Sequence, residues 1–432
     1  MKTKYDTAVI GGGLAGFVAA IKAAEGGQSV VLLEKSNRFG GRAMTNHTSG
    51  VYLNMGGHAL YKAGRAIAIL KELGIKLEGG KPSANVNVLW NDRLVMLGSD
   101  PIRMLASKLL PWSGKMQLIR LFMKLMRLNV NDIQANSVRE WAEDEVKDPM
   151  VRHIFYALSR TATYVSDPDH QLAKPALAQI QRSLKGVLYI NGGWQTIIDE
   201  LNDRAQKAGV TIVSGKHVSA IQHEGGKVLG LLLADYSTVE AANVICTASP
   251  SECFKLVPGA EYTSLQRWAI EAKPATAACL DVGLRELPVP ENEVALGLDQ
   301  PVFFSNHSVN AKMSDNGSYV IHIVKYNRPG ENDPKAAEQL LLETMNRLQP
   351  GWESKAVAKQ FLPSIPVTQG YPHINQSMAD IGPDVPEIQG LYVAGDWASH
   401  GELLADASAA SAVRAAEAIV HRSSAARRAA AI

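Results

Sequence analysis

The chain begins with two short apolar runs separated by an Ala-rich stretch. Residues 7–10 are apolar and run into glycine, residues 17–24 suit a helix, and residues 29–33 form a second apolar run that ends in an acid. Continuous apolar runs of this length are typical of parallel strands buried on both faces. The first 34 residues therefore predict a strand–helix–strand unit.

The turn after the first run has glycines at positions 11, 13 and 16. In a strand–turn–helix context, Gly11 makes the turn, Gly13 lets the backbone approach a pyrophosphate, and Gly16 lets helix and strand pack closely. The free N–H groups at the helix start, at Leu14 and Ala15, would hold the phosphates. A glycine-rich turn without a ligand is the alternative.

Glu34 ends the second run, about 20 residues after the glycine turn. A carboxylate at this place binds ribose hydroxyls and repels a 2′-phosphate. The pattern thus predicts a dinucleotide site that disfavours an NADP-type ribose.

Residues 102–128 have helical periodicity and predict an amphipathic helix with a basic face. One interpretation is a helix that lies on a membrane surface, and the other is a packed helix with a solvated basic side. The apolar stripes contain Met116, Leu118, Ile119, Phe122, Met123, Leu125 and Met126, and the basic side contains Arg120, Lys124 and Arg127.

The rest of the chain predicts more strands. Apolar runs occupy 210–213, 217–221 and 243–248, a largely strand-like region covers 274–363, and a strand at 390–394 precedes Gly395-Asp396 and a helix over about 405–421. His322 lies in an alternating strand, opposite the face of Tyr319 and Ile321. It either lines a pocket or has a structural role.

Composition bounds the class of protein. The chain has 432 residues, 46% of them hydrophobic and 20% charged, which fits a globular protein of two or three domains. With 44 basic and 42 acidic residues the net charge is +2, so no overall field attracts nucleic acid. The 36 glycines are clustered, which indicates tight turns or close contact between backbone and ligand.

Cysteine and histidine positions restrict the chemistry. The three cysteines form no CxxC pair, so we expect no disulfide framework and a reducing cytoplasm. No apolar run reaches the roughly 18 residues of a membrane span. The dispersed histidines predict no metal site, and no GxSxG motif supports a hydrolase.

Residues 34–45 read EKSNRFGGRAMT, an acid and a basic residue followed by Gly-Gly-Arg and Thr. This segment resembles the superfamily of flavin amine oxidases, phytoene desaturases and protoporphyrinogen oxidases. The resemblance implies FAD, bound in part by Glu34, Lys35 and Gly41, with Arg42 against the pyrophosphate and the flavin edge. A surface salt bridge is the alternative role for Arg42.

Two further segments carry the resemblance. Gly56 and Gly57 match a family segment that passes the flavin ring, although Asn54 stands where an acid is usual. His58 and Tyr61 would face the flavin or pack in the core. Near the C-terminus, the resemblance implies that Asp396 after Gly395 contacts the ribityl–pyrophosphate part and that the N–H near Ala405 contacts reduced flavin. In the middle of the chain, it implies that the backbone of Val218 contacts adenine. A plain turn with Asp396 as helix N-cap is the alternative.

The resemblance implies an α/β fold: a Rossmann-like FAD-binding domain and a discontinuous α+β substrate domain. The FAD domain would comprise residues 1–80, 185–255 and 380–432, and the substrate domain 81–184 and 256–379. We expect non-covalent FAD, because covalent relatives use a cysteine before the Gly-Asp motif and this chain has none after Cys279.

The expected reaction is hydride transfer from a carbon of a small organic substrate to flavin N5, with O2 or another electron acceptor. Residues 303–308 and the Met-rich helix favour phytoene-desaturase-like dehydrogenation of an apolar substrate. Two alternatives stay open: an amine or amino-acid oxidase that yields an imine and H2O2, and a non-catalytic FAD-binding protein. The candidate pocket residues are His58, Tyr61, His322, Tyr371 and Trp397, and the last two would supply aromatic walls.

Overall fold

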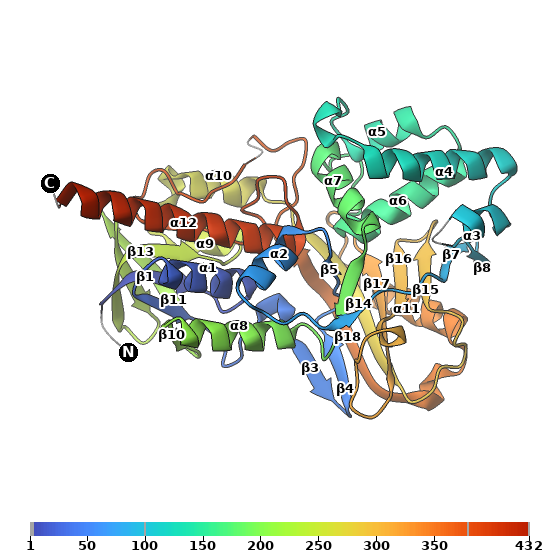
Figure 1. Ribbon diagram of the computed structural model, residues 1–432, viewed down its shortest axis with the longest axis horizontal. Coiled ribbons are helices and arrows are strands. Elements are labelled where there is room, and N and C mark those ends of the chain that lie inside the picture. The colour runs from blue at the N-terminus through green and yellow to red at the C-terminus, as the bar shows by residue number, and fades with distance from the viewer. Residues whose placement is uncertain (1–3, 99–100, 378–379, 431–432) are drawn as a thin grey trace.

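Strands from three separate parts of the chain form one seven-stranded sheet (Figure 1). The computed structural model describes residues 4–98, 101–377 and 380–430. The order is β10-β2-β1-β13-β12-β11, with β19 beside β13. The pairs β10–β2, β2–β1, β1–β13 and β13–β19 are parallel, and the pairs β13–β12 and β12–β11 are antiparallel. The strands are β1 (Lys4–Ile10), β2 (Val30–Leu33), β10 (Thr211–Val213), β11 (Val218–Glu224), β12 (Lys227–Leu233), β13 (Thr238–Cys246) and β19 (Leu391–Val393).

Helices cover both faces of this sheet. The side chains of α1 (Leu14–Glu25), α2 (Arg65–Glu72), α8 (Gln195–Lys207) and α12 (Leu404–Ala430) share one hydrophobic cluster on one face. On the other face lie α9 (Pro250–Leu256) and α10 (Ser264–Glu271), which pack with Val244 and Leu391. The predicted Rossmann-like layering is therefore confirmed.

A second, mixed seven-stranded sheet has the order β18-β14-β17-β16-β15-β7-β8. One face packs against α11 (Pro334–Leu348), and strands β14 and β17 also contact β4 (Val51–Asn54). The helix α11 interrupts residues 274–363, so the expectation of a mostly strand-like region missed it. The strands are β7 (Val86–Trp90), β8 (Arg93–Met96), β14 (Ala275–Leu284), β15 (Val294–Gly297), β16 (Val302–Asn306), β17 (Tyr319–Tyr326) and β18 (Ala356–Thr368).

A helical part lies at one end of the second sheet (Figure 1). The stretch 102–128 is helical as expected, but it forms two helices instead of one. Between them lie Pro111, which lacks an N–H, and Ser107, whose hydroxyl donates to the Met96 carbonyl at 2.6 Å. The helices are α3 (Pro101–Ala106), α4 (Trp112–Arg127), α5 (Val138–Glu145), α6 (Pro149–Thr163) and α7 (Ala173–Leu184).

Small elements join the two parts. They are the hairpin β3 (Thr45–Thr48)–β4 (Val51–Asn54) and the sheet of β5 (Leu60–Tyr61), β9 (Val187–Ile190) and β6 (Gly79–Gly80). Short 3-10 turns occur elsewhere along the chain, at Gly41–Ala43, Val130–Asp132, Ala260–Tyr262, His307–Val309 and Trp352–Lys355. The strands of the first sheet fall within 1–80, 185–255 and 380–432, and those of the second within 81–184 and 256–379. The domain boundaries themselves stay a prediction.

The contact between β1 and α1 depends on Gly16. A Cβ atom at this position would lie 1.8 Å from the Gly11 carbonyl oxygen, so any side chain would push α1 away from the turn. We expect Gly16→Ala to destabilise the protein by about 2 kcal/mol, measured by urea unfolding. The control is Gly27→Asn, because Gly27 has φ +81°, a Cβ there would meet nothing within 4 Å, and Asn tolerates this conformation. Equal stability of the Gly16 variant and the wild type would contradict this account.

Candidate active site

A cavity of about 380 Å³ begins at the glycine turn of the first sheet and ends against the second sheet. Most of the residues predicted to touch the cofactor line it, including the glycine turn, Arg42, Asp396 and Ala405. Its lining residues are Gly11, Gly13, Leu14, Ala15, Glu34, Gly40, Gly41, Arg42, Ala43, Met55, Gly57, His58, Ala59, Tyr61, Tyr164, Trp194, Thr247, Cys279, Ile365, Pro366, Val367, Gly395, Asp396, Leu404, Ala405 and Ser408.

The glycine turn has the geometry of an anion cradle. Gly11 has φ +107°, and a Cβ on it would lie 2.4 Å from the Thr247 hydroxyl, so only glycine fits. Helix α1 starts without a side-chain cap and without an acid in its first turn. Its free N–H groups and positive helix end can therefore bind a phosphate.

Glu34 lies at the end of β2 and lines the same cavity. Its carboxylate accepts hydrogen bonds from the N–H groups of Gly12 at 2.6 Å and Ser36 at 2.8 Å, which hold it beside the turn. Lys35 is exposed and Val218 is buried in the core of the first domain, and neither lines the cavity. Their predicted roles toward FAD stay predictions.

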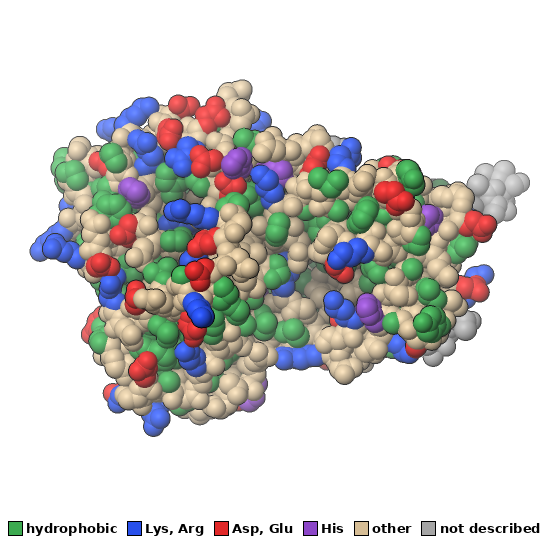
Figure 2. Space-filling view, turned by 180° about the vertical axis from the view of Figure 1, so that it is seen from behind, with side chains coloured by type: hydrophobic (Ala, Val, Ile, Leu, Met, Phe, Trp, Pro, Cys, Tyr) green, Lys and Arg blue, Asp and Glu red, His purple; other side chains and the backbone are tan. Residues whose placement is uncertain are grey.

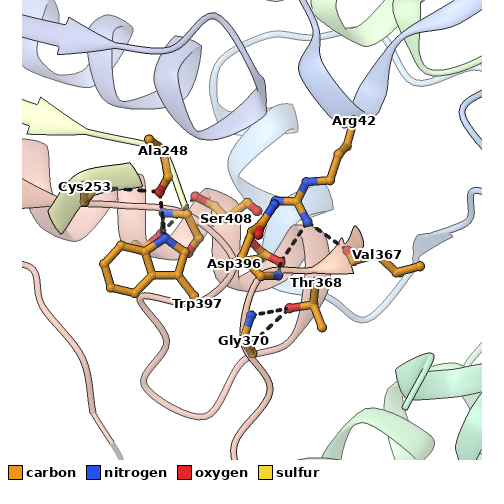
Figure 3. A network of polar contacts seen from close by, with 12 residues as sticks. Arg42, Ala248, Cys253, Val367, Thr368, Gly370, Asp396, Trp397 and Ser408 are labelled. Carbon is orange, nitrogen blue, oxygen red and sulfur yellow. Dashed lines mark hydrogen bonds and ion pairs between the residues drawn. The ribbon is translucent and has the colours of Figure 1, made fainter. Parts of the chain in front are cut away.

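Arg42 and Asp396 form a two-pronged ion pair across the cavity (Figure 3). The guanidinium lies 2.8 and 2.6 Å from the two carboxylate oxygens and also donates to the Val367 carbonyl at 2.8 Å. The Gln369 N–H donates to the same carboxylate at 2.8 Å. Arg42 thus pairs with a buried carboxylate at the cavity, and its predicted contact with FAD stays a prediction.

The electrostatics of this pair follow from its position. Burial alone would raise the pKa of Asp396, but Arg42 attracts the carboxylate and holds that pKa below its ordinary value. Asp396 is 2% exposed, whereas the Arg42 side chain keeps 40% accessibility because it lines the cavity. The guanidinium thus remains available to a ligand while its charge is balanced.

The segment through Gly56 and Gly57 passes close to the second sheet. A Cβ on Gly56 would lie 2.7 Å from Ile365 Cδ1 and 2.9 Å from Cys279 Sγ, so a side chain cannot be added here. The Tyr164 hydroxyl donates to the Gly57 carbonyl at 2.6 Å. Gly57 lines the cavity, and Gly56 supports it from behind.

His58 and Tyr61 both line the cavity, as expected for residues that face the flavin. His58 Nδ1 lies 2.9 Å from the Gly56 carbonyl oxygen, and burial lowers the pKa of His58 below its ordinary value. The Tyr61 hydroxyl donates to the Ala162 carbonyl at 2.8 Å, and burial raises the pKa of Tyr61. Both side chains are therefore uncharged near neutral pH.

The other three pocket candidates do not line this cavity. His322 is fully buried behind Gly57. The Tyr371 hydroxyl donates to Asp167 at 2.7 Å, and Tyr371 lines a separate cavity of about 270 Å³. The Trp397 indole N–H donates to the Ala248 carbonyl at 2.9 Å (Figure 3). The Trp397 ring also packs near Trp268. The expectation that Tyr371 and Trp397 wall the flavin site is corrected, because hydrogen bonds hold both side chains elsewhere.

Helix α12 starts at the cavity with Leu404 in a left-handed conformation, φ +57°. Leu404, Ala405 and Ser408 line the cavity, so the helix N-terminus faces it. Asp406, the residue after Ala405, accepts a hydrogen bond from the Ala66 N–H at 2.8 Å and so caps the start of α2. A Cβ on Gly64 would lie 2.3 Å from this carboxylate, which explains the glycine there.

Sequence reasoning missed several cavity residues. Thr247 follows the end of β13, just as Gly11 follows β1, and the carboxyl ends of neighbouring parallel strands meet at one edge. That signal could have found it. Tyr164 follows α6, Cys279 and Ile365 come from two strands of the second sheet, and no local motif marks them.

These residues fit FAD. The glycine cradle, which side chains would fill, and the uncapped start of α1 match a pyrophosphate. The Glu34 carboxylate matches a ribose, and the Arg42–Asp396 pair matches a polar chain. Within the described residues, no three His, Cys, Asp or Glu side chains come together as a metal site. Cys246, Cys253 and Cys279 are all buried free thiols.

A sequence profile of the family of flavin-containing amine oxidoreductases matches residues 14–420. The chain belongs to this family. Segments of the rat and mouse proteins named amine oxidase [flavin-containing] B are 38% identical to it over 78 residues, which is 18% of this chain and 15% of each relative. The matched segment therefore spans a small part of those relatives.

Solved structures share the whole fold. An oxidoreductase from Methanosarcina mazei has a TM-score of 0.78 and 21% identity, and the match covers 96% of this chain and 100% of that one. Cyclohexylamine oxidase from Brevibacterium oxydans has a TM-score of 0.71 and 15% identity, over 97% and 99% of the two chains. Putrescine oxidase bound to putrescine has a TM-score of 0.73 and 14% identity, again over 97% and 99%. At these identities the likeness shows the fold.

The Arg42–Asp396 pair predicts how stability depends on pH. Because the folded-state pKa of Asp396 is lowered, the pair stabilises the protein fully above the ordinary aspartate pKa, and this stabilisation is lost as pH falls through the lowered value. We expect Asp396→Asn to cost about 2 kcal/mol at pH 7, less than a fully buried pair because Arg42 is partly accessible. The cost should shrink below pH of about 4.

Urea unfolding of the wild type and of Asp396→Asn at several pH values, without added FAD, measures this difference. Glu286→Gln, which removes one member of an exposed pair with Lys355, is the control and should leave stability unchanged within error. A cost for Asp396→Asn that is the same at pH 3 and pH 7 would contradict the electrostatic explanation.

Proposed function

We propose that the protein is an FAD-dependent oxidoreductase that binds FAD non-covalently and oxidises a small organic substrate. The observation that carries the proposal is that one cavity joins the glycine turn and Glu34 to Arg42, Asp396 and the start of α12. Family membership over residues 14–420 supports the same conclusion.

Each part of the cavity has a role toward the cofactor. The start of α1, with Gly11 and Gly13, would hold the pyrophosphate, and Glu34 would bind ribose hydroxyls. Arg42 and Asp396 would bind the chain between the pyrophosphate and the ring system. The N–H groups at the start of α12 would favour negative charge on the ring.

Bound FAD supplies a hydride acceptor for the substrate carbon. The protein's own residues position the reactants and exclude water. The far end of the cavity is walled by Met55, Tyr61, Tyr164, Cys279 and Ile365, which are mostly apolar or aromatic and leave little for water to bind. This wall supports an apolar substrate and phytoene-desaturase-like dehydrogenation.

A second candidate is oxidation of an amine or amino acid to an imine, with H2O2 as co-product. It is supported by the family description and by the amine-oxidising enzymes among the structural neighbours. The two candidates differ in the bond that is oxidised, C–C or C–N, and a substrate screen separates them.

We expect the purified protein to be yellow and to release its flavin on acid precipitation, since the binding is non-covalent. Anaerobic addition of a substrate should bleach the flavin absorbance. Bleaching by polyenes supports the desaturase, whereas bleaching by amines or amino acids with H2O2 formed in air supports the oxidase. A colourless protein that takes up no added FAD would contradict the proposal, and bound FAD that no substrate class reduces would support a non-catalytic FAD-binding protein.

We also propose that the helical end of the protein contacts a membrane surface. Large apolar side chains there are exposed, among them Ile102 at 80%, Trp112 at 68% and Met126 at 55%. Figure 2 shows hydrophobic, basic and acidic side chains intermixed at this end of the molecule. Among the described residues, no helix is long and apolar enough to cross a bilayer. The basic residues in the same stretch are Arg103, Lys108, Lys115, Arg120, Lys124 and Arg127.

We expect the protein to sediment with vesicles that contain anionic lipid, and to do so less as salt increases. Replacing Ile102 and Trp112 by Ser should weaken this binding about tenfold, because both side chains would enter the interface. Ile270→Ser is the matched control, since Ile270 is 75% exposed on α10, which packs against the first sheet away from the helical end. Equal sedimentation of both variants would contradict the assignment.

A further inference from the structure

Two cavities lie next to each other on one face of the second sheet. The first is the candidate active site of about 380 Å³, and the second has a volume of about 270 Å³. Strand β14 contributes Cys279 to the first cavity and Ala275 to the second, and strand β18 contributes Ile365 and Ser364 in the same way. Alternate residues of a strand point to one face, so Ala277 lies between the two contributions of β14.

The end of helix α6 separates the two cavities. Tyr164 lines the first cavity, and the next residue, Val165, lines the second. Val165 is buried against Ala275 and Tyr371. Ala277 packs in the same cluster as Tyr164 and has only a methyl group, so it fills little of the space between the cavities. The barrier therefore consists largely of the Tyr164 ring and Val165.

Few contacts hold the Tyr164 ring in this position. Its backbone is left-handed, with φ +60° and ψ +10°, which is uncommon for a residue with a bulky side chain. Its hydroxyl donates to the Gly57 carbonyl at 2.6 Å, and its ring meets Tyr326 edge-on at 5.6 Å between centroids. Burial raises the pKa of Tyr164 well above its ordinary value, so the hydroxyl keeps its proton. If the ring turned away, the hydrogen bond with Gly57 is the one that would break.

The first of two carboxylates in the second cavity, Asp167, already has partners for both oxygens. The Tyr371 hydroxyl donates to one oxygen at 2.7 Å, and His170 Nδ1 lies 2.8 Å from the other. Asp167 is buried, whereas His170 is partly accessible. The cavity therefore offers no unpaired carboxylate at this position to a ligand.

The second carboxylate, Glu331, is also paired. Its oxygens lie 2.6 Å from Lys325 Nζ and 2.9 Å from the Arg328 N–H. Burial alone would raise the pKa of Glu331, but the hydrogen bond with Lys325 holds it below its ordinary value. The Arg328 side chain is exposed and lines the same cavity. A charged ligand group would thus meet groups of both signs and gain little net attraction.

Uncharged hydrogen-bonding groups complete the lining of the second cavity. Ser166, Asn332 and Ser364 all line it, and within the described residues none of these three side chains makes a hydrogen bond. Hydroxyl and amide groups can both donate and accept. They match a neutral ligand group that also does both, and a hydroxyl is the simplest such group.

We propose that the second cavity is the outer part of the substrate site, where it takes a neutral, hydroxyl-bearing end of an elongated apolar substrate. Tyr164 is then the specificity-determining residue, because its ring lies between this end and the first cavity. The inference rests on the proposed function, since the body of the substrate would lie in the first cavity beside FAD. The second cavity binds one end of the substrate and takes no part in the oxidation.

The test titrates the FAD-loaded protein with hexanol and decanol and follows the flavin absorbance. Hexanol fits the first cavity alone, whereas decanol is long enough to place its hydroxyl in the second. Ser364→Phe puts a ring into the second cavity, so it should weaken decanol binding about tenfold and leave hexanol binding unchanged. The matched control is Ser219→Phe, an exposed serine on β11 of the first sheet. Equal effects of Ser364→Phe on the two alcohols would overturn the proposal.

A substitution of Tyr164 tests the barrier itself. Tyr164→Gly suits the left-handed backbone and joins the two cavities, so decanol should bind about tenfold more tightly relative to hexanol than in the wild type. Tyr164→Phe keeps the ring and loses only the bond with Gly57, so its effect should be smaller. A decanol-to-hexanol ratio in Tyr164→Gly that equals the wild-type ratio contradicts the role of Tyr164.

The chemical class of the bound end is tested with decanoate and decylamine. Both should bind the wild type more weakly than decanol, and tighter binding of either one overturns the assignment of a neutral end. A protein that takes up no FAD fails the proposed function, and calorimetry with the same alcohols then tests the second cavity separately. A Ser364→Phe effect confined to decanol in that experiment would support the second cavity without the proposed function.

Discussion

The Arg42–Asp396 ion pair is the interaction on which the candidate site depends. It joins residues 354 positions apart in the sequence, one after the N-terminal strand–helix–strand unit and one before the C-terminal helix. Arg42 also bonds the Val367 carbonyl of β18, so the same guanidinium connects the two sheets. Without this pair, a buried carboxylate would face the cavity uncompensated, and the start of α12 would lose its link to the glycine turn.

Much of the first domain could be predicted from the sequence because its signals are local. The glycine turn, the acid after β2 and the Gly-Asp after β19 each depend on a few neighbouring residues whose backbone geometry is demanding. The structure brings them to one cavity, together with His58 and Tyr61. Position 54 shows why the departure from the family is tolerated: the Asn54 amide oxygen accepts from Thr45 at 2.7 Å and from the Trp194 N–H at 3.0 Å.

For the second domain, only the α+β class could be predicted, and not the residues that it contributes to the cavity. Tyr164, Cys279 and Ile365 meet at the cavity because a sheet of mixed strands and a helix end happen to converge there, and no sequence spacing encodes that convergence. The aromatic character of Trp397 and Tyr371 also did not predict their position, since the polar atoms of both side chains form hydrogen bonds away from the cavity. The alternation of residues placed His322 on a strand, but it could not show that His322 contacts Asp281, which lies 41 residues away in the sequence.

The discontinuous first sheet has a consequence for how the protein is made. Strand β19 completes the sheet beside β13, and α12 completes the hydrophobic cluster around Phe17 and Ile21 of α1. A Cβ on Gly26 would lie 2.2 Å from Val420, so the two helices are in close contact. The surroundings of the glycine turn therefore come from parts of the chain nearly 400 residues apart in sequence, and they are complete only when β19 and α12 have docked. A chain cut before β19 would retain the glycine motif without the cavity around it.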